Sequence, residues 1–302
     1  MATLKGDNLR VFSYNETTDK YEVIGMSTDC TVTLNTNTEE GHTKDDFSVY
    51  SKPLVNSQSW TIQVNSMSSI DANQMLADIK AKKLFKLMWD ESGGGANQTP
   101  QEAGFRRSGY AYLNDVTFNF NDRENSAMNL QFTGQSALTK ETQVPYASIS
   151  VDGYTKGQFV RLILGSDATT ATKVIGAAKQ LSMHVSVTLE DVTTKDTEGL
   201  YQNMEPTMIS YDITSNALVR GNDTITSETL AQDLASIEDI YEAGTPVRWK
   251  ICNMTGDNQR TIASELVNGF AIINSLTINA PSRQNATYTA QLQGYGAYNV
   301  SQ

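Results

Sequence analysis

Apolar and polar residues alternate one by one along many segments of the chain. Examples are CTVTLNT (30–36), SWTIQVNS (59–66), DVTFNFND (115–122) and MHVSVTLE (183–190). A period of two with one apolar face predicts antiparallel strands that bury one face and leave the other in solvent. The positions predicted to be buried are Val32, Leu34, Trp60, Ile62, Val64, Val116, Phe118, Phe120, Met128, Leu130, Phe132, Met183, Val185, Val187, Leu189, Leu276, Ile278, Tyr288, Ala290 and Leu292.

Two segments have helical spacing instead. Residues 71–83 begin with Asp71 as a possible N-cap, and Met75, Leu76 and Ile79 follow on one stripe. Residues 226–244 begin at Thr226 or Ser227 and end before Gly244, with a longer apolar stripe between them. That stripe consists of Leu230, Leu234, Ile237, Ile240 and Tyr241.

The chain repeats itself. KGDNLRVF (5–12) matches KGQFVRLI (156–163), and SWTIQVNSM (59–67) matches SYDITSNAL (210–218), both at an offset of 151. GYAYLNDVTFNF from Gly109 matches GFAIINSLTINA from Gly269 at an offset of 160. Because the order and the offsets persist, we interpret the chain as a tandem duplication of a whole domain. The predicted domains are 1–141 and 142–302, with a short connector near Pro145.

Together these patterns predict an α+β fold that is mostly β. Each unit has its strands in a small sandwich or barrel-like curled sheet, flanked by one helix that precedes the last strands. The solvent faces of the strands are rich in Thr, Asn, Gln and Ser and poor in charge. An ordinary water-facing sheet explains this composition, and a smooth, hydrated wall that interacts weakly with its contents is the functional alternative.

Charge and composition limit the function. The 302 residues carry a net charge of −11, divided as −5 over residues 1–145 and −6 over the remainder. Such an acidic surface does not capture nucleic acid by counterion release. No stretch reaches the roughly 18–20 apolar residues of a membrane span, and the first residues lack a signal-peptide pattern, so synthesis in the cytosol is expected. Cys30 and Cys252 lie in strand-like runs and are expected to be buried free thiols.

No catalytic constellation is recognisable. His42 lies in a polar loop and His184 on a strand face, and neither has a nucleophile or metal motif around it. The acidic pairs, such as Asp45 with Asp46, lack the spacing of a calcium loop. We therefore expect no enzyme activity, no cofactor and no metal site, although an ion at the acidic loops is not tested by the sequence.

The order of features resembles a known family. Each unit has a K-G arm, a strand pair around a long polar loop, a helix and then G-[YF]-A-x-[LI]-N-x-[VL]-T-[FI]-N, before a closing strand that ends in GQSAL (134–138) or GYGAY (294–298). This pattern resembles the major tail tube proteins of long-tailed bacteriophages, whose relatives form the tubes of contractile tails and of type VI secretion. The resemblance covers almost the whole chain, which departs from the usual pattern by carrying two units.

The resemblance implies a structural virion protein. Tail tube proteins form hexameric rings that stack into a hollow tube, give strands to an inner β-barrel and reach the next ring with a long loop. For a two-unit chain it implies three chains per pseudo-hexameric ring, a conduit for DNA during ejection, and tape measure, baseplate or tip, and terminator proteins as partners at the tube ends. It also implies a location in the virion tail, assembly in the cytoplasm of the host bacterium, DNA passage without specific binding, and no membrane partner.

Two sets of residues are the site candidates. The long segments 35–58 and 190–208 carry apolar side chains that favour a contact with a neighbouring ring over disorder. The ring-stacking candidates are Glu39, Glu40, Asp45, Asp46, Phe47, Val49, Tyr50, Leu54, Glu198, Leu200, Tyr201 and Met204. The lumen-facing candidates are Thr31, Thr33, Asn35, Thr61, Gln63, Asn65, Thr117, Asn119, Gln131, Ser186, Thr188, Thr277, Thr289 and Gln291.

Two alternatives stay open at this point. Tandem β-domains with Thr- and Asn-rich faces also occur in extracellular adhesins and carbohydrate-binding proteins, although the chain begins without a signal peptide. A secretion tube of the type VI kind would share the fold, normally as a single unit. Assembly into rings would distinguish the two tube hypotheses from the hypothesis of an adhesin or carbohydrate-binding protein.

Overall fold

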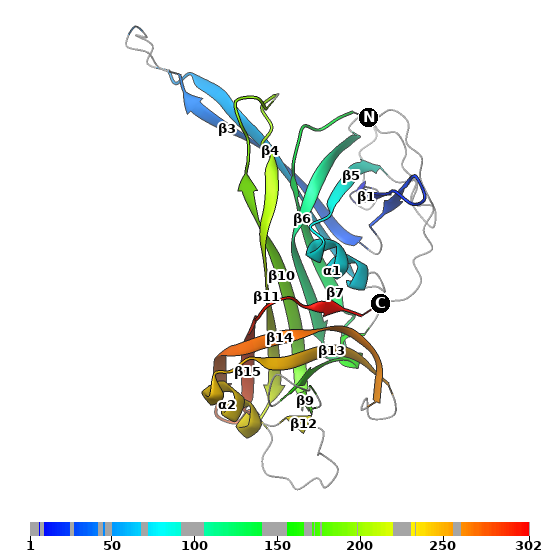
Figure 1. Ribbon diagram of the computed structural model, residues 1–302, viewed down its shortest axis with the longest axis vertical. Coiled ribbons are helices and arrows are strands. Elements are labelled where there is room, and N and C mark those ends of the chain that lie inside the picture. The colour runs from blue at the N-terminus through cyan, green and yellow to red at the C-terminus, as the bar shows by residue number, and fades with distance from the viewer. Residues whose placement is uncertain are drawn as a thin grey trace.

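The protein is described by a computed structural model. It describes residues 6, 9–24, 27–41, 45, 50–67, 72–91, 106–140, 156–165, 171, 173–175, 177–197, 199–219, 231–232, 234–255 and 261–301. The molecule is elongated, and two β-rich halves with one helix each follow one another along its long axis (Figure 1). The predicted class, α+β and mostly β, is confirmed.

The elements of the two halves follow the same order. The first half consists of β1 (Leu9–Asn15), β2 (Lys20–Val23), β3 (Ser27–Glu40), β4 (Pro53–Met67), α1 (Ala72–Lys80), β5 (Leu84–Glu91), β6 (Arg107–Asn121) and β7 (Ala127–Gly134). The second half consists of η2 (Gly157–Phe159), β8 (Val160–Leu164), β9 (Lys173–Ile175), β10 (Ala178–Asp191), β11 (Met204–Leu218), β12 (Ala231–Gln232), α2 (Leu234–Ala243), β13 (Val247–Thr255), β14 (Thr261–Asn279), β15 (Thr287–Gly294) and β16 (Asn299–Val300).

The strand pairing of the two halves is also the same. In the first half the antiparallel ladder runs β2-β1-β5-β6-β7-β4-β3, and in the second it runs β9-β8-β13-β14-β15-β11-β10. The register agrees residue by residue, since Ile62 lies opposite Phe132 and Ile213 opposite Leu292. These are the offsets of 151 and 160 in the sequence repeat. The boundary between 141 and 142 lies outside the described residues and stays a prediction.

One apolar cluster runs through both halves. It contains the inward faces of the central strands together with Leu76 and Ile79 of α1 and Ile237 and Ile240 of α2. Most positions that alternation predicts as buried are buried, among them the runs of β4, β6, β7, β10 and β15. The helices therefore cover the core side of the sheet, and the opposite strand faces remain for solvent or for partners.

An aromatic ring and two glycines stabilise the same place in each half. Trp60 lies against Gly109 and Gly134, where a Cβ on Gly134 would come within 2.2 Å of the indole. Tyr211, at the equivalent position, lies against Gly269 and Gly294, and a Cβ on Gly294 would come within 2.5 Å of its ring. The glycines of the repeated motif are thus required by the aromatic side chain that packs flat on them.

Both helices are shorter than predicted. They span Ala72–Lys80 and Leu234–Ala243, whereas the sequence predicted 71–83 and 226–244. Each ends where a residue adopts positive φ, Lys82 at 52° and Gly244 at 60°, because this left-handed backbone stops the helix. The predicted caps Asp71, Thr226 and Ser227 and the stripe residue Leu230 lie outside the described residues.

Burial was predicted wrongly at positions on three strands, β3, β14 and the end of β10. Leu34 is 63% exposed and Ile278 is 49% exposed, while Val32, Leu276 and Leu189 are only half-buried. Leu34 lies on β3 and Ile278 on the end of β14, and both strand segments lack a neighbour on one side among the described strands. Their apolar side chains therefore have no second strand to cover them.

The two thiols differ for a related reason. Cys252 is fully buried on β13, and burial raises its pKa to about 11. Cys30 is only half-buried, in contrast to the prediction, because it lies on the edge strand β3. Both cysteines are free.

Candidate assembly site

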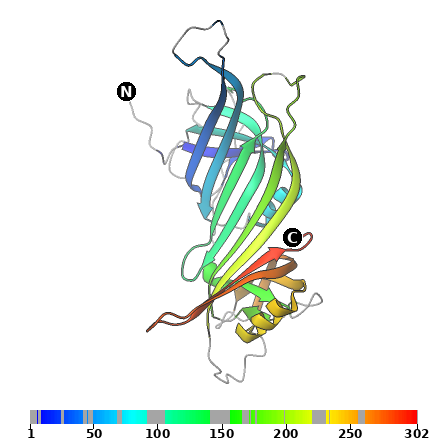
Figure 2. The same ribbon diagram turned by 90° about the vertical axis from the view of Figure 1, so that its left-hand side faces the viewer.

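Eight strands form a continuous run through the molecule in the order β3-β4-β7-β6-β10-β11-β15-β14. In Figure 2 its blue, green and yellow-green strands lie side by side as one broad twisted sheet, which continues into the orange strands below. One face of this run packs on the core, and the other carries the polar residues of the alternating pattern. The run joins the two halves, because β6 belongs to the first and β10 to the second.

The predicted lumen-facing residues share the polar face of this run. Thr31, Gln63 and Gln131 lie directly opposite one another on three neighbouring strands, and Thr277 lies opposite Thr289. Polar side chains form hydrogen bonds across neighbouring strands, between Gln63 and Gln131 at 3.3 Å and between Ser186 and Ser210 at 2.8 Å. Most of the remaining candidates alternate with buried residues in the same way: Thr61, Asn65, Thr117, Asn119, Thr188 and Gln291. Thr33 and Asn35 lie on either side of the exposed Leu34 on β3.

Cationic side chains are almost absent from these strands. Of the 23 Lys and Arg residues of the chain, the eight strands contain only Arg107 and Lys179. Arg107 lies at the end of β6 that pairs with β5, and Lys179 lies near the start of β10. The middle of the polar face therefore carries no Lys or Arg side chain and is built from neutral groups, a few carboxylates and the imidazole of His184.

The internal joint, defined here as the pairing of β6 residues 115–121 with β10 residues 180–186, connects the two halves. Met183 lies opposite Phe118, and Val185 lies opposite Val116. All four side chains are at most 2% exposed. The internal joint is thus buried in the core on one side and belongs to the polar face on the other.

A cluster of charged side chains lies on the polar side of the internal joint. His184 of β10 bonds through Nε2 to Asp115 of β6 at 2.7 Å and through Nδ1 to Asp212 of β11 at 2.9 Å. Burial lowers the pKa of His184, but the hydrogen bonds and negative charges of Asp115 and Asp212 outweigh it and leave the pKa raised. When it is protonated, the imidazole donates to both carboxylates, connects three strands and offsets part of their negative charge.

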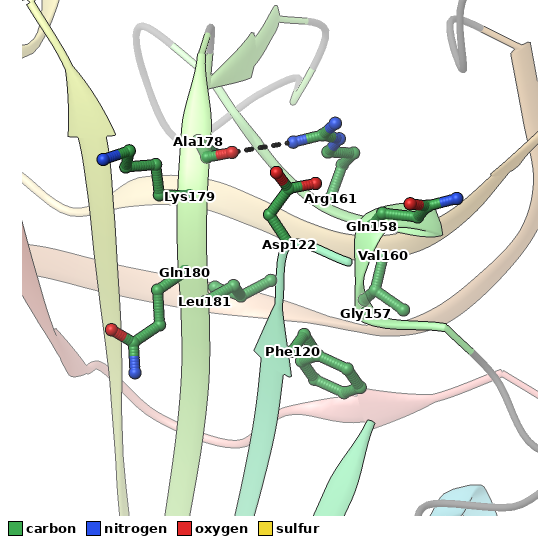
Figure 3. Close-up of a pocket in the computed structure, with 10 residues that line it drawn as sticks. All are labelled: Phe120, Asp122, Gly157, Gln158, Val160, Arg161, Ala178, Lys179, Gln180 and Leu181. Atoms are coloured by element: carbon green, nitrogen blue, oxygen red, sulfur yellow. Dashed lines mark hydrogen bonds between the residues drawn. The ribbon is translucent and has the colours of Figure 1, made fainter. Parts of the chain in front are cut away.

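A second contact closes the lower end of the internal joint. Gly157 of η2 donates its backbone N–H to the oxygen of Glu124 at 2.9 Å, and a Cβ on Gly157 would lie 2.4 Å from the oxygen of Asn121. Figure 3 shows the small hollow between η2, the end of β6 and the start of β10. Arg161 reaches across it and donates through Nη1 to the oxygen of Ala178 at 3.2 Å. Only glycine allows the second half to approach β6 this closely.

A third contact lies on the core side of the sheet, where α1 meets the C-terminal segment of the second half. Tyr298 donates its hydroxyl to the oxygen of Leu76 at 2.8 Å, and Lys80 Nζ donates to the oxygen of Tyr298 at 2.6 Å. Burial raises the pKa of the Tyr298 hydroxyl, which keeps it a donor. The two halves of the chain therefore contact each other through a strand pair, the η2 segment and helix α1.

The long segments form extended hairpins rather than long loops. Pairing of β3 with β4 continues to Glu40 and Pro53, and pairing of β10 with β11 continues to Asp191 and Met204. The connections therefore shrink from 35–58 and 190–208 to 41–52 and 192–203. In Figure 1 the β3–β4 hairpin projects beyond the body at one end of the molecule.

The ring-stacking candidates lie on or near these hairpins. Glu39 and Glu40 are exposed on β3, and Tyr50 and Leu54 are 78% and 62% exposed. Leu200 accepts a hydrogen bond from the backbone of Gln58 at 2.7 Å, so the second connection lies beside the first hairpin. Tyr201, Met204 and the exposed Asp45 are also described, whereas His42, Asp46, Phe47, Val49 and Glu198 lie outside the described residues.

The charged cluster and the role of Gly157 were not predicted. His184 was interpreted as a lone surface histidine, because its partners are distant in sequence. The repeat contains a usable signal, since His184, Asp115 and Asp212 replace Thr33, Ser275 and Thr61 at equivalent positions. The first half contributes Asp115 and the second contributes His184 and Asp212, and the equivalent positions in the other copy are uncharged.

The described residues suggest neither a metal centre nor a membrane segment. In these parts of the chain, no group of three or more His, Cys, Asp or Glu side chains is placed to hold a metal ion. Within the same residues, neither helix is long and apolar enough to cross a membrane.

Comparisons with known proteins give one family match and several similar solved chains, each of which covers about half of the chain. Among curated proteins, no relative matches the sequence. A chain of the native gene transfer agent virion has 14% identity and a TM-score of 0.38, covering 49% of this chain and 99% of its own length. A chain of the empty gene transfer agent tail, refined with C6 symmetry, has 14% identity and a TM-score of 0.37, covering 48% of this chain and 95% of its own.

A third solved chain, from the SPP1 tail tube, has 16% identity and a TM-score of 0.36, and covers 48% of this chain and 78% of its own. Each of these chains thus aligns with about half of the present one. Residues 156–300 match the model of the family described as phage tail tube protein. Over these residues, which make up the second half of the chain, the predicted resemblance to the tail tube proteins of phages is confirmed.

Proposed function

We propose that the protein is a non-enzymatic structural subunit of a phage tail tube, with three two-domain chains in each pseudo-hexameric ring. The observation that carries the proposal is the eight-strand run, which is built from two equivalent halves. Among the described strands, the outer edge of β3 at one end and residues 275–279 of β14 at the other have no second neighbour. A chain whose two ends are equivalent to its own internal joint is suited to heterologous, closing association. Three such chains replace six single domains.

The dimensions suit a conduit. Eight strands from each of three chains give a barrel of 24 strands. With strands about 4.8 Å apart and tilted by roughly 40°, its backbone diameter is on the order of 50 Å. Closing the ring also removes exposed strand edges, which otherwise favour uncontrolled aggregation. Side chains on the polar face leave room for duplex DNA in the middle.

The chemistry of the polar face suits DNA passage without retention. Phosphates bind proteins mainly through Lys and Arg, and the eight strands carry only Arg107 and Lys179. Neutral Thr, Asn, Gln and Ser side chains keep the wall hydrated. The carboxylates and the net charge of −11 repel the phosphate backbone mildly and so prevent the cargo from adhering.

The hairpins are proposed to connect one ring to the next. The β3–β4 hairpin projects from the body and exposes Tyr50 and Leu54, and apolar side chains at such a tip are expected to find a partner surface (Figure 1). Tape measure, baseplate or tip, and terminator proteins would bind the two ends of the stacked tube. The tube would assemble in the host cytoplasm, and the protein would then be part of the virion tail.

The proposal is tested by negative-stain electron microscopy of the purified chain at high concentration, together with mass photometry. We expect rings or tubes whose repeating ring contains three chains. A matched control, Tyr50→Lys, alters the exposed connection at the hairpin tip, which lies outside the eight strands, so it should allow rings while it suppresses stacking. Rings of six full chains would contradict the stoichiometry, and a strict monomer that binds glycans would favour the adhesin alternative.

A further inference from the structure

Two strand edges of the eight-strand run have no neighbour among the described strands. One is the outer edge of β3, which pairs only with β4. The other is the edge of β14 along Ser275–Asn279, where β13 no longer runs beside it. Unpaired edges with apolar side chains are templates for another strand.

These two edges correspond to the two sides of the internal joint. β3 occupies in the first half the position that β10 occupies in the second, and β14 corresponds to β6. Both β6 and β14 even carry the same irregularity, between Leu113 and Asp115 and between Ile273 and Ser275. The chain therefore contains one completed copy of a joint and the two separate sides of a second.

The exposure of the side chains agrees with this correspondence. Leu34 is 63% exposed, whereas its equivalent Val185 in the internal joint is fully buried. Ile278 is 49% exposed, whereas its equivalent Phe118 is 2% exposed. The positions that sequence alternation marks as buried are thus covered only where a second half is present.

We propose that β3 of a second copy of this chain pairs antiparallel with β14 in the register of the internal joint. In this register Leu34 lies opposite Leu276 and Val32 opposite Ile278, copying the pairs of Val185 with Val116 and of Met183 with Phe118. Cys30 then lies opposite Ala280, in the place of Leu181 opposite Phe120. The inference rests on the proposed ring and adds to it which residues meet.

The N-terminal segment supplies a second part of the same surface. Gly157 packs on the backbone of Asn121 inside the chain, whereas its equivalent Gly6 has no atom within 4 Å of its Cβ position. The residue equivalent to Asn121 is Pro281, which lies two residues beyond the end of β14. Gly6 of the second copy therefore approaches the backbone of Pro281 as Gly157 approaches Asn121.

The joint between chains differs from the internal one in its charges. Thr33, Thr61 and Ser275 stand where the internal joint has His184, Asp212 and Asp115. Backbone pairing and apolar contact thus hold the chains together, and a charged cluster is confined to the joint within each chain. This difference opposes the pairing of β10 of one chain with β14 of another, because His184 would lose Asp115 there.

A disulfide across the new joint tests the register. In Ala280→Cys the new thiol faces the natural Cys30 of the next chain, at a separation that a cross-strand disulfide can span. Mild oxidation of the assembled protein should give covalent dimers and trimers on a denaturing gel without reductant, ending at three chains when the ring closes. The variant Ala280→Cys with Cys30→Ser should give none of these species.

A register control uses the same natural thiol. Ile278→Cys faces the same side of β14 but lies diagonally from Cys30, at about 7–8 Å, which is beyond the usual span of a disulfide. It should cross-link at least tenfold less than Ala280→Cys. A second pair, Leu34→Cys with Leu276→Cys in a Cys30→Ser chain, should cross-link as well as the first.

The outcomes separate the register from the proposed function. Tubes that form without a link in either matched pair would overturn the register and leave the tube intact. Links that continue to six chains would support the register and contradict three chains per ring. Protein that neither assembles nor cross-links would overturn both proposals.

Discussion

The internal joint and the two open edges are the same structure in two states. Within the chain, β10 covers β6, and Val185 and Phe118 are buried. At the ends of the run, the equivalent Leu34 and Ile278 remain exposed to solvent. The comparison shows that a strand can carry apolar side chains that stay exposed in the single chain, because the strand that would cover them belongs to another chain.

The largest expected effect separates folding from assembly. Val185→Asp places an unpaired carboxylate in the internal joint, so it should lower the free energy of unfolding by about 3 kcal/mol or more. Leu34→Asp, at the equivalent open edge, should change the stability of the single chain by less than about 0.5 kcal/mol. It should nevertheless abolish rings, because a charge would lie in the new joint.

Urea denaturation and light scattering measure the two quantities. The control is Leu34→Val, which introduces the residue found at the equivalent position of the internal joint, Val185, and should leave assembly unchanged. Equal destabilisation of the single chain by both aspartates would remove the distinction between joint and edge.

How much of this could be predicted from sequence depends on the feature. Alternation in SWTIQVNS and DVTFNFND indicated the buried faces correctly, because period two determines which side chains share a face. It did not reveal which strands lie at an edge, since Leu34 and Val185 have the same local pattern. Only the pairing partners distinguish them.

The hairpins were underestimated for a different reason. Residues Thr36–Glu40 have no apolar alternation, so they resembled a loop, yet they pair with β4 through backbone hydrogen bonds. The charged cluster escaped notice because Asp115, His184 and Asp212 are far apart in sequence and meet only when the two halves join. Aligning the two copies of the repeat shows which residues are equivalent, but it does not show which residues of one copy contact the other.

The second expected effect concerns the two equivalent glycines. Gly157→Ala should destabilise the chain by about 1–3 kcal/mol, because the new methyl group would press on the backbone of Asn121. Gly6→Ala has open space around it and should leave the thermal transition of the single chain unchanged. If Gly6 contacts a second chain as proposed, the same change raises the concentration needed for assembly, as read by sedimentation.

The contrasting result for this pair would be equally clear. A Gly6→Ala chain that assembles at the wild-type concentration would show that the N-terminal contact has no counterpart between chains. A Gly157→Ala chain of wild-type stability would show that η2 moves away from β6 without loss.

The smallest expected effect depends on pH. The folded-state pKa of His184 is raised above its ordinary 6.5, so its contribution is present in full below about pH 6.5 and is lost as the pH rises through the raised value. His184→Thr introduces the residue found at the equivalent position, Thr33. It should therefore lower the free energy of unfolding most at about pH 6 and little at about pH 9. Since the side chain is one-third exposed, the difference should be a few tenths to about 1 kcal/mol.

Denaturation of both chains at the two pH values measures this difference. Thr33→His is the matched control, because its neighbour across the strand pair is Thr61 rather than a carboxylate, and its stability should not follow the same pH dependence. If His184→Thr lowered the free energy of unfolding equally at both pH values, the imidazole would stabilise the joint by packing and not by its charge.

The pairing of β6 with β10 inside one chain also changes the statistics of assembly. Strand β10 meets β6 at an effective concentration that the connecting chain determines, whatever the amount of protein present. A ring of three such chains forms through two associations, where six separate domains would need five, and each association costs several kcal/mol of translational and rotational freedom, roughly 4–15 at standard concentration. Duplication therefore lowers the concentration at which a closed ring first becomes stable, without any improvement in the contacts themselves.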